Sequence, residues 1–408
     1  MTVETAKPAH AVLPLPLSLF STLRRAEVWS TFFVVVLALL IVPYVSNNLA
    51  LKLTLWVSFG LCALSLNFVW GRAGIFSFGQ NALFGLGAYA YAVVALNAYP
   101  TTEETLTALL ASGMVGAIAA GALGYFLFYS RLSDVYLSIV TLAVTLIIYT
   151  VLASTAGPEY HIGQAELGGF NGIPSLPGIA FPAWSGIGSG ELSIRQLMGF
   201  AIVFAGSIYL LVCILARSSF GLKIDGLRSN ELRMELLGYD VRRLKIVVFC
   251  IGGAVSGFGG GLFAAWGTFV NPSVFSLAQA ATVVVWSMVG GRESLLGAFV
   301  GVLVVQSVAD GADLLVRQQT PLIVGLILVF VVVAMPQGIV PSFKKLFRLP
   351  SNIDALDMTS FELVALDDNR RRTGVVSVAN ITKSFGGVTV LEEISASFGL
   401  CPVQAQAV

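Results

Sequence analysis

The chain has 408 residues, of which 56% are hydrophobic and only 11% are charged. Soluble domains carry about 25% charged residues, so this composition excludes an ordinary soluble enzyme and a disordered scaffold. A net charge of +1 is too small for the positive field of a nucleic-acid-binding protein, and two histidines with four scattered cysteines predict no metal site. The chain is therefore predicted to be a polytopic membrane protein with no nucleic-acid partner and no cofactor.

Ten apolar stretches lie close to the length of about 20 residues that a helix needs to cross a membrane. In chain order they cover residues 28–46, 49–70, 78–97, 105–129, 133–154, 198–215, 246–268, 274–290, 294–311 and 321–335. The third stretch is rich in glycine and polar at its start, so we expect it to be broken, and the last three are short enough to be partly re-entrant. The sequence predicts an all-α bundle of about eight to eleven transmembrane helices.

Lysine and arginine residues indicate the orientation of these spans, because positively charged loops stay in the cytoplasm. With a cytoplasmic N-terminus, ten crossings place residues 1–27, 71–77, 130–132, 216–245, 291–293 and 336–408 inside. Of the 23 lysine and arginine residues, 20 then lie inside, and only Lys52, Arg195 and Arg317 lie outside. We predict that both termini are cytoplasmic, with residues 1–27 as an extension before a first span that acts as a retained signal anchor.

Charged side chains are almost absent from the centres of the predicted spans. Ion-coupled carriers use buried ionisable residues, so their absence points to an energy source on another chain. Asp310 and Asp313, near an outer helix end, keep open the alternative of an ion-coupled secondary carrier for an amino acid or amide. A channel lined by uncharged helices is the third hypothesis.

Glycines and mildly polar side chains gather in the segment over residues 71–89. Glycine permits close helix packing, and it tolerates a break at membrane depth when the backbone lines a cavity. Tight packing alone and a broken helix beside a translocation path are equally favoured interpretations. In the second interpretation, the candidate path residues are Ser77, Gln80, Asn81, Gly85, Thr141 and Thr145.

The largest cytoplasmic loop, residues 216–245, contains the signals of a short helix. Ser229 or Asn230 can cap its start, and Gly238 can end it in the left-handed conformation. Its apolar side would consist of Leu232, Leu236 and Leu237. We predict a short helix below the membrane that docks into another protein, and a solvated connector is the less favoured alternative.

This loop resembles the coupling segment of ABC importer permeases, in which a glycine stands seven positions after a glutamate. Arg233 and Met234 replace small residues that are usual there. A wider resemblance over about residues 28–342 is to the second permease of the branched-chain amino acid importer family, which includes urea and short-amide importers. It is carried by residues 71–89, 134–142, 168–173, 287–297 and 335–339, and the coupling residues that it implies are Glu231, Glu235 and Gly238.

The resemblance implies that residues 28–342 form the permease domain of an ATP-driven importer for branched-chain amino acids, urea or a related small amide. It also implies ABC ATPase subunits, a second homologous permease and an extracytoplasmic substrate-binding protein as partners. The chain would lie as a multi-pass protein in the lipid bilayer of a bacterial inner membrane. No covalent chemistry would occur on it, so it would not be an enzyme.

The C-terminal part of the chain is more charged than the part before it. Residues 343–374 read as a cytoplasmic linker, and residues 375–408 begin with two apolar–polar alternating strands. They resemble the opening strands of an ABC ATPase subunit, in which Phe385 matches an aromatic residue that stacks on adenine. No phosphate-binding loop follows, so we expect ATP hydrolysis on separate subunits. The tail is interpreted as the remnant of a permease–ATPase fusion, and a regulatory tail is the alternative.

Overall fold

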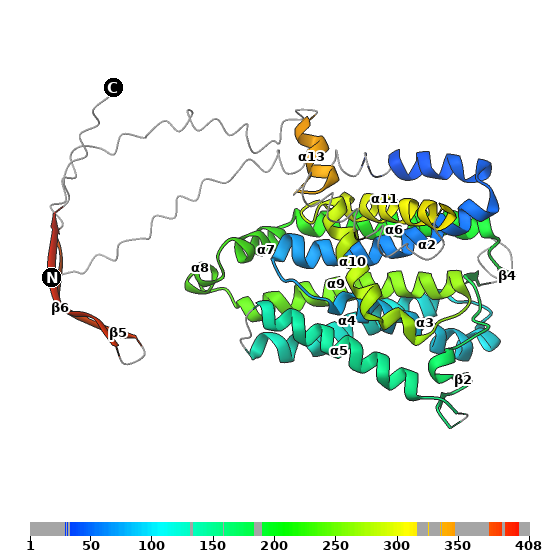
Figure 1. Ribbon diagram of the computed structural model, residues 1–408, viewed down its shortest axis with the longest axis horizontal. Helices are drawn as coiled ribbons and strands as arrows, with labels where there is room; N and C mark the ends of the chain where they lie inside the picture. The colour runs from blue at the N-terminus through cyan, green and yellow to red at the C-terminus, as the bar shows by residue number, and fades with distance from the viewer. Residues whose placement is uncertain are drawn as a thin grey trace, which may run out of the picture. The chain divides into compact units, whose positions relative to one another are not determined.

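The computed structural model describes residues 33–130, 134–157, 159–182, 190–315, 337–346, 375–385 and 388–399, together with residues 29, 31, 325 and 335. The chain divides into two compact units, Met1–Phe347 and Arg348–Val408. The first unit is a helix bundle and the second contains one strand pair (Figure 1). The predicted all-α bundle is therefore confirmed.

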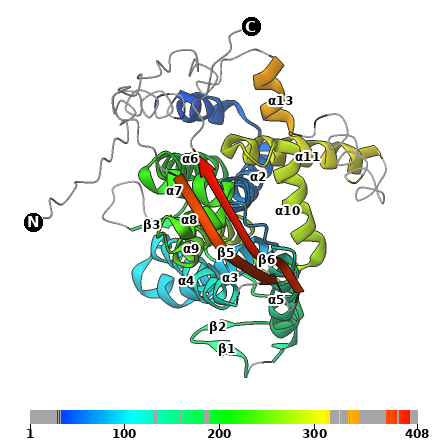
Figure 2. The ribbon, with the colours of Figure 1, turned by 90° about the vertical axis from the view of Figure 1, so that its left-hand side faces the viewer.

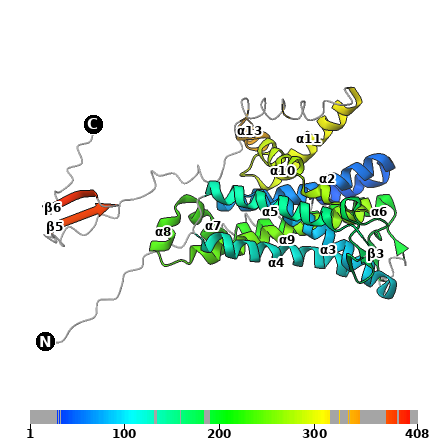
Figure 3. The same cartoon turned by 60° about the horizontal axis from the view of Figure 1, so that its bottom comes forward.

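Three helices form the centre of the bundle. They are α2 (Asn47–Leu66), α3 (Gly79–Thr102) and α9 (Val241–Gly267), and α9 packs against both of the others. Helices α4 (Leu106–Tyr129), α5 (Asp134–Ser154) and α6 (Ile194–Ala216) lie around them, and Figure 3 shows α3, α4, α5 and α9 running along the bundle. Buried residues make up 61% of the most apolar stretch of α9 but only 22% of that in α5, as expected for a central and a lipid-facing helix.

Six helices among the described residues are long and apolar enough to cross a membrane. Helices α10 (Leu277–Gly290) and α11 (Leu295–Leu315) form a further pair that is bent by 113°, so α10 runs across the direction of α11 in Figure 1. The first predicted stretch contains a shorter apolar helix, Phe33–Tyr44, and almost all of residues 321–335 lie outside the described residues. The predicted total of eight to eleven spans thus stays a prediction.

Glycines bring α9 close to the backbones of its neighbours. A Cβ atom on Gly257 would lie 2.4 Å from the Ser112 carbonyl oxygen of α4, and one on Gly260 would lie 1.9 Å from the Phe84 carbonyl oxygen of α3. Both distances are shorter than any real contact, so only glycine fits. This packing fixes α3 and α4 on two sides of α9.

Helix α3 begins inside the bundle. Helix α2 continues as a π-helical turn, η2 (Asn67–Arg72), after which the chain turns back and α3 starts at Gly79. The first turn of α3 lies beside Gly252, which is close to the middle of the 27-residue α9. The glycine-rich segment 71–89 thus contains a break before Gly79, but the prediction that residues 78–97 are themselves broken is wrong, since α3 is continuous from Gly79 to Thr102.

The two ends of the bundle differ in structure (Figure 1). One end holds α7 (Ser219–Ser229) and α8 (Glu231–Leu236), and Figure 2 faces this end. The opposite end holds the ordered loop between α5 and α6. Its short elements are β1 (His161–Ile162), β2 (Ala165–Glu166), η3 (Gly169–Asn171), β3 (Ala180–Phe181) and β4 (Gly190–Glu191).

Two short helices complete the first unit, and a hairpin forms the second. The helices are η5 (Pro272–Phe275), which precedes α10, and α13 (Ile339–Leu346), which packs against α10 and α11. In the second unit, β5 (Val375–Phe385) pairs antiparallel with β6 (Val388–Gly399). The apolar–polar alternation predicted this pair, and the adenine-stacking role of Phe385 stays a prediction.

Candidate docking segment and intramembrane polar cluster

The docking segment, residues 217–240, forms two short helices between α6 and α9. Asn230 caps α8, because its Oδ1 accepts a hydrogen bond of 2.9 Å from the Arg233 backbone N–H. Ser229 instead donates to the Asp225 carbonyl oxygen at 2.8 Å. Gly238 follows the end of α8 with a φ of +85°, in the left-handed region that favours glycine. The chain therefore turns at Gly238 before it enters α9.

Helix α8 presents an apolar surface that nothing in the described part of the chain covers. The exposed fractions are 66% for Leu232, 81% for Leu236 and 67% for Leu237. On the inner side, only Met234 of α8 is buried. Grouped exposed leucines on a charged segment are typical of a protein-binding surface.

Three of the four carboxylates in the docking segment have an ion-pair partner within the chain. Glu231 lies 2.6 Å from the Lys245 ammonium, Asp240 lies 2.9 Å from the Arg243 guanidinium, and Asp225 lies 3.7 Å from Arg72. Glu235 has no such partner among the described residues. Among the described residues it is therefore the one carboxylate of this segment that is not engaged in an ion pair.

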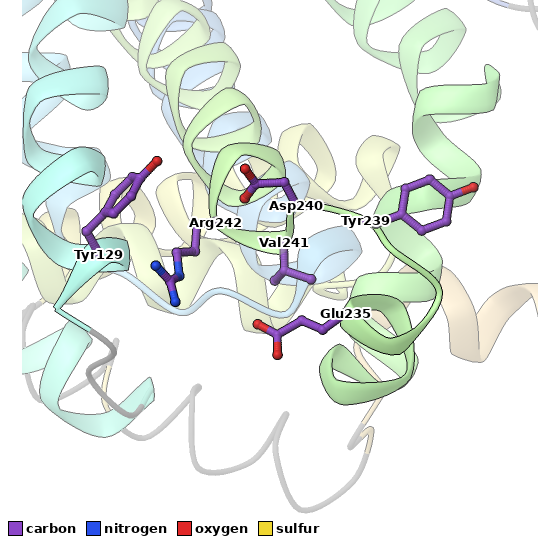
Figure 4. Close-up of a pocket in the computed structure, with 6 residues that line it drawn as sticks. All are labelled: Tyr129, Glu235, Tyr239, Asp240, Val241 and Arg242. Atoms are coloured by element: carbon purple, nitrogen blue, oxygen red, sulfur yellow. The ribbon is translucent and has the colours of Figure 1, made fainter.

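Glu235 lines a cavity of about 300 Å³ between the end of α4 and the turn from α8 to α9. Its other lining residues are Tyr129, Tyr239, Asp240, Val241 and Arg242. The Arg242 guanidinium lies 5.6 Å from the centre of the Tyr129 ring, a cation–π contact. In Figure 4, Glu235 and Arg242 border the same space and the Tyr239 ring is directed away from it. The cavity therefore has an acidic residue, without an ion-pair partner among the described residues, near an arginine that contacts an aromatic ring.

Inside the bundle, Gln80 connects α2, α3 and α9. Ser65 Oγ lies 2.6 Å from Gln80 Oε1 and 2.7 Å from the Gly252 carbonyl oxygen. Ser256 Oγ donates to the Gln80 carbonyl oxygen at 2.7 Å. These groups are buried, where hydrogen bonds between helices help to fix their packing. The Gln80 amide nitrogen keeps no partner among the described residues.

A second set of polar groups lies on the face of α3 that packs against η5. The Asn81 side-chain nitrogen donates to the Val274 carbonyl oxygen at 2.8 Å, and a Cβ on Gly85 would lie 2.4 Å from the Phe275 ring. One helical repeat further, the Tyr89 ring lies 5.9 Å from the Phe275 ring. Buried Asn81 Oδ1 and the Tyr89 hydroxyl have no partner among the described residues. Buried polar atoms without a hydrogen-bond partner are uncommon in folded proteins, so this face of α3 differs from an ordinary apolar core.

The remaining path candidates lie around Gly79 and on α5. Ser77 Oγ accepts a hydrogen bond of 3.0 Å from the Gly79 N–H, and a Cβ on Gly79 would lie 3.2 Å from Thr141 Cβ. The hydroxyls of Thr141 and Thr145 bond to carbonyl oxygens of their own helix. The candidates thus form two groups. Gln80 contacts α2 and α9, whereas the other candidates lie near η5 or α5.

The sequence prediction missed Ser65 and Tyr89 as members of these groups. Ser65 is a small hydroxyl residue in an apolar helix, where such residues commonly bond across helices. Tyr89 lies eight residues after Asn81, so helical spacing places both on one face of α3. These two signals were present in the sequence.

Comparison with known proteins identifies the family. The model of the family "Branched-chain amino acid transport system / permease component" matches residues 48–334. The chain belongs to this family. It is 28% identical over 357 residues to the high-affinity branched-chain amino acid transport system permease protein LivM of Escherichia coli K12, covering 82% of this chain and 80% of that protein. LivM of Salmonella typhimurium LT2 is 29% identical over 318 residues, which cover 73% of this chain and 71% of that protein.

Another matching protein is named for a sugar. The L-arabinose ABC transporter permease protein AraH of Azospirillum brasilense is 26% identical over 247 residues, covering 59% of this chain and 67% of that protein. No solved structure matches the chain. The chain is thus a multi-pass transport subunit of the ABC permease type, and members of this family work with ATPase subunits, a partner permease and a binding protein.

Proposed function

We propose that this permease imports branched-chain amino acids across a bacterial inner membrane. The relatives that match most of its length are named for branched-chain amino acid transport, which supports this solute class. Urea and short amides, expected from the sequence, find no support in these relatives. Residues 28–342 are proposed to be the permease domain, with residues 343–374 as the linker to residues 375–408.

The docking segment supports the ATP-driven mechanism most directly. We place the ATPase subunit against Leu232, Leu236 and Leu237 of α8, because burying a leucine contributes about 1.5–3 kcal/mol. Beside this surface, the carboxylate of Glu235, which has no ion-pair partner in the described part of the chain, is suited to a basic side chain of the ATPase. Glu231 would act indirectly, since it holds α8 to α9 through Lys245.

The solute path is proposed along the face of α3 that meets η5 and α5. Ser77, Asn81, Gly85 and Thr141 border it, and Tyr89 is added from the structure. Gln80 supports it through its contact with Ser65 of α2, and Thr145 through a hydrogen bond within α5. These groups are uncharged and can bond to the ammonium and carboxylate of a zwitterionic solute without an opposing buried charge.

The alternative of an ion-coupled carrier rested on two aspartates near the outer end of α11. Asp310 forms an ion pair with Lys52 at 2.6 Å, and both side chains are more than one third exposed. The Asp313 side chain lies outside the described part of the chain. An exposed, paired aspartate is poorly suited to cycle an ion through the membrane.

Photo-cross-linking tests the proposed docking surface. A photoreactive amino acid at Leu236 should cross-link to the ATPase subunit in a purified, transport-active complex. The control is Ile147, an apolar and exposed position on membrane-spanning α5, which should give no ATPase adduct. An active complex without an adduct at Leu236, or with equal adducts at both positions, would refute the proposal.

A further inference from the structure

Arg228, at the end of α7, contacts two breaks in the membrane helices that are far apart in sequence. Its Nη1 donates to the Gly71 carbonyl oxygen at 2.6 Å, where η2 ends before the turn into α3. Its Nη2 pairs with Glu293, in the turn between α10 and α11. One guanidinium thus links the docking segment to both breaks.

The two breaks also touch each other directly beside Arg228. A Cβ on Gly71 would lie 1.9 Å from the Arg292 carbonyl oxygen, so the two backbones are in contact there. The Asn67 side chain donates to the Ser294 carbonyl oxygen at 2.8 Å. A Cβ on Gly74 would lie 3.4 Å from Arg228 Cγ, so the stem of the arginine packs on the returning chain. A displacement of Arg228 therefore acts on both breaks together.

A second arginine fixes the same junction from the other side. Arg72 Nη2 donates to the Ala216 carbonyl oxygen at 3.2 Å, and the Arg72 guanidinium lies 3.7 Å from Asp225. Residues of η2 thus contact α7 at Asp225 and Arg228, and they contact the end of α6 at Ala216. The leucine surface of α8, one residue beyond α7, remains exposed.

Both breaks lead to the proposed solute path. The chain that leaves Gly71 reaches Gln80 and Asn81 within ten residues, and α10 follows directly from η5, whose Val274 accepts the Asn81 hydrogen bond. Non-helical segments and π-helical turns are where packed helices bend. Motion at the Arg228 junction would therefore reach α3 and η5, which form two walls of the path.

We infer that Arg228 is a positioning residue that transmits movement of the docking segment to the break before α3 and to the turn between α10 and α11. This inference rests on the proposed function. Arginine suits the position because its planar fork serves two acceptors at once, whereas a lysine ammonium on a flexible stem does not hold that geometry. The pair with Glu293 is partly exposed and adds little stability, so the contact matters for geometry.

The test compares variants in the complete importer reconstituted in proteoliposomes with ATPase, partner permease and binding protein. Arg228→Ala should insert, assemble and keep basal ATP hydrolysis, while solute imported per ATP hydrolysed falls about ten-fold, within the usual range of coupling between sites. In Arg228→Lys, the solute imported per ATP hydrolysed should fall by a smaller factor. The matched control is Arg243→Ala, which removes an ion pair that is more exposed and touches neither break.

The outcomes separate this inference from the proposed function. Failure of the wild-type complex to couple ATP to uptake contradicts the proposed function. A normal ratio of solute to ATP in both Arg228 variants, with a coupled wild type, overturns only the role of Arg228. Loss of ATPase binding in Arg228→Lys, or an equal loss of coupling in Arg243→Ala, also overturns the role of Arg228.

Discussion

At the residue scale, the docking segment depends on a few positions whose surroundings differ in kind. Gly238 is constrained by its backbone alone, because no atom lies within 4 Å of where its Cβ would be. Glu231 and Glu235 lie one helical turn apart, yet within the described residues only Glu231 is ion-paired. The sequence predicted all three residues but could not assign their separate roles, because Lys245, the partner of Glu231, belongs to the next helix.

Gly238→Val should uncouple transport while the membrane bundle stays folded. A side chain in the left-handed conformation costs about 1–2 kcal/mol, so the turn after α8 would change shape. We expect normal insertion but loss of solute-stimulated ATP hydrolysis. Gly267→Val is the control, since its Cβ also meets open space and its φ is ordinary. Full stimulation in Gly238→Val would mean that the turn is a simple connector.

Glu235→Gln should weaken ATPase binding without lowering the thermal stability of the permease. The carboxylate has no partner to lose within the described chain, and its loss leaves a basic group of the ATPase unpaired. We expect about a ten-fold weaker Kd in lipid nanodiscs and a smaller dependence of binding on salt. Glu231→Gln should instead leave the Kd for the ATPase nearly unchanged and lower the stability of the permease by about 1 kcal/mol or less. Equal Kd values for Glu235→Gln and wild type would reject this role.

At the element scale, the presence of the helices could be predicted from the sequence, but the residues at which they begin and end could be predicted less well. Hydropathy placed the start of one span at residue 246, whereas α9 begins at Val241, because Asp240 caps a charged first turn that stays helical. The sequence predicted that these two stretches are short enough to be partly re-entrant, but the 113° bend between α10 and α11 could not be predicted. It depends on Gly291, whose φ is +104°, and on its contact with Gly338 in a distant segment. The Ser65–Gln80–Ser256 network likewise exists only after three helices pack.

The packing of α9 predicts a strong response to a single methyl group. Gly257→Ala would place Cβ 2.4 Å from a backbone oxygen of α4, so the helices must separate. We expect a loss of about 1–3 kcal/mol, measured as unfolding in mild detergent. Gly267→Ala, at the end of the same helix and in open space, should change stability by less than about 0.5 kcal/mol. Similar stabilities for the two variants would show that the α4–α9 contact is loose.

At the scale of the whole molecule, the basic residues and the loop with acidic residues lie at opposite ends of the bundle, as the predicted orientation requires. The docking segment, with its lysines and arginines, lies at one end, and the loop carrying Glu166 lies at the other. The length, composition and motifs of the sequence were enough to predict the fold class and the family. Which polar groups face each other required the packed structure.

This arrangement predicts the accessibility of each end to a reagent that does not cross membranes. Cysteines introduced at Leu236 and at Glu166 should be labelled from opposite sides, with residue 236 protected in intact cells and residue 166 modified. Both positions are exposed in the structure, so accessibility reports the side of the membrane. Labelling of residue 236 from outside would place the docking segment where no ATPase could reach it.

The energy source of transport tests the central claim most directly. The measurement is uptake of radiolabelled leucine into proteoliposomes that hold the complete importer, with either ATP or an imposed proton or sodium gradient as the energy supply. We predict uptake that requires ATP hydrolysis and the binding protein and that persists when ion gradients are dissipated. Uptake by the permease alone, driven by an ion gradient without ATP, would contradict the assignment.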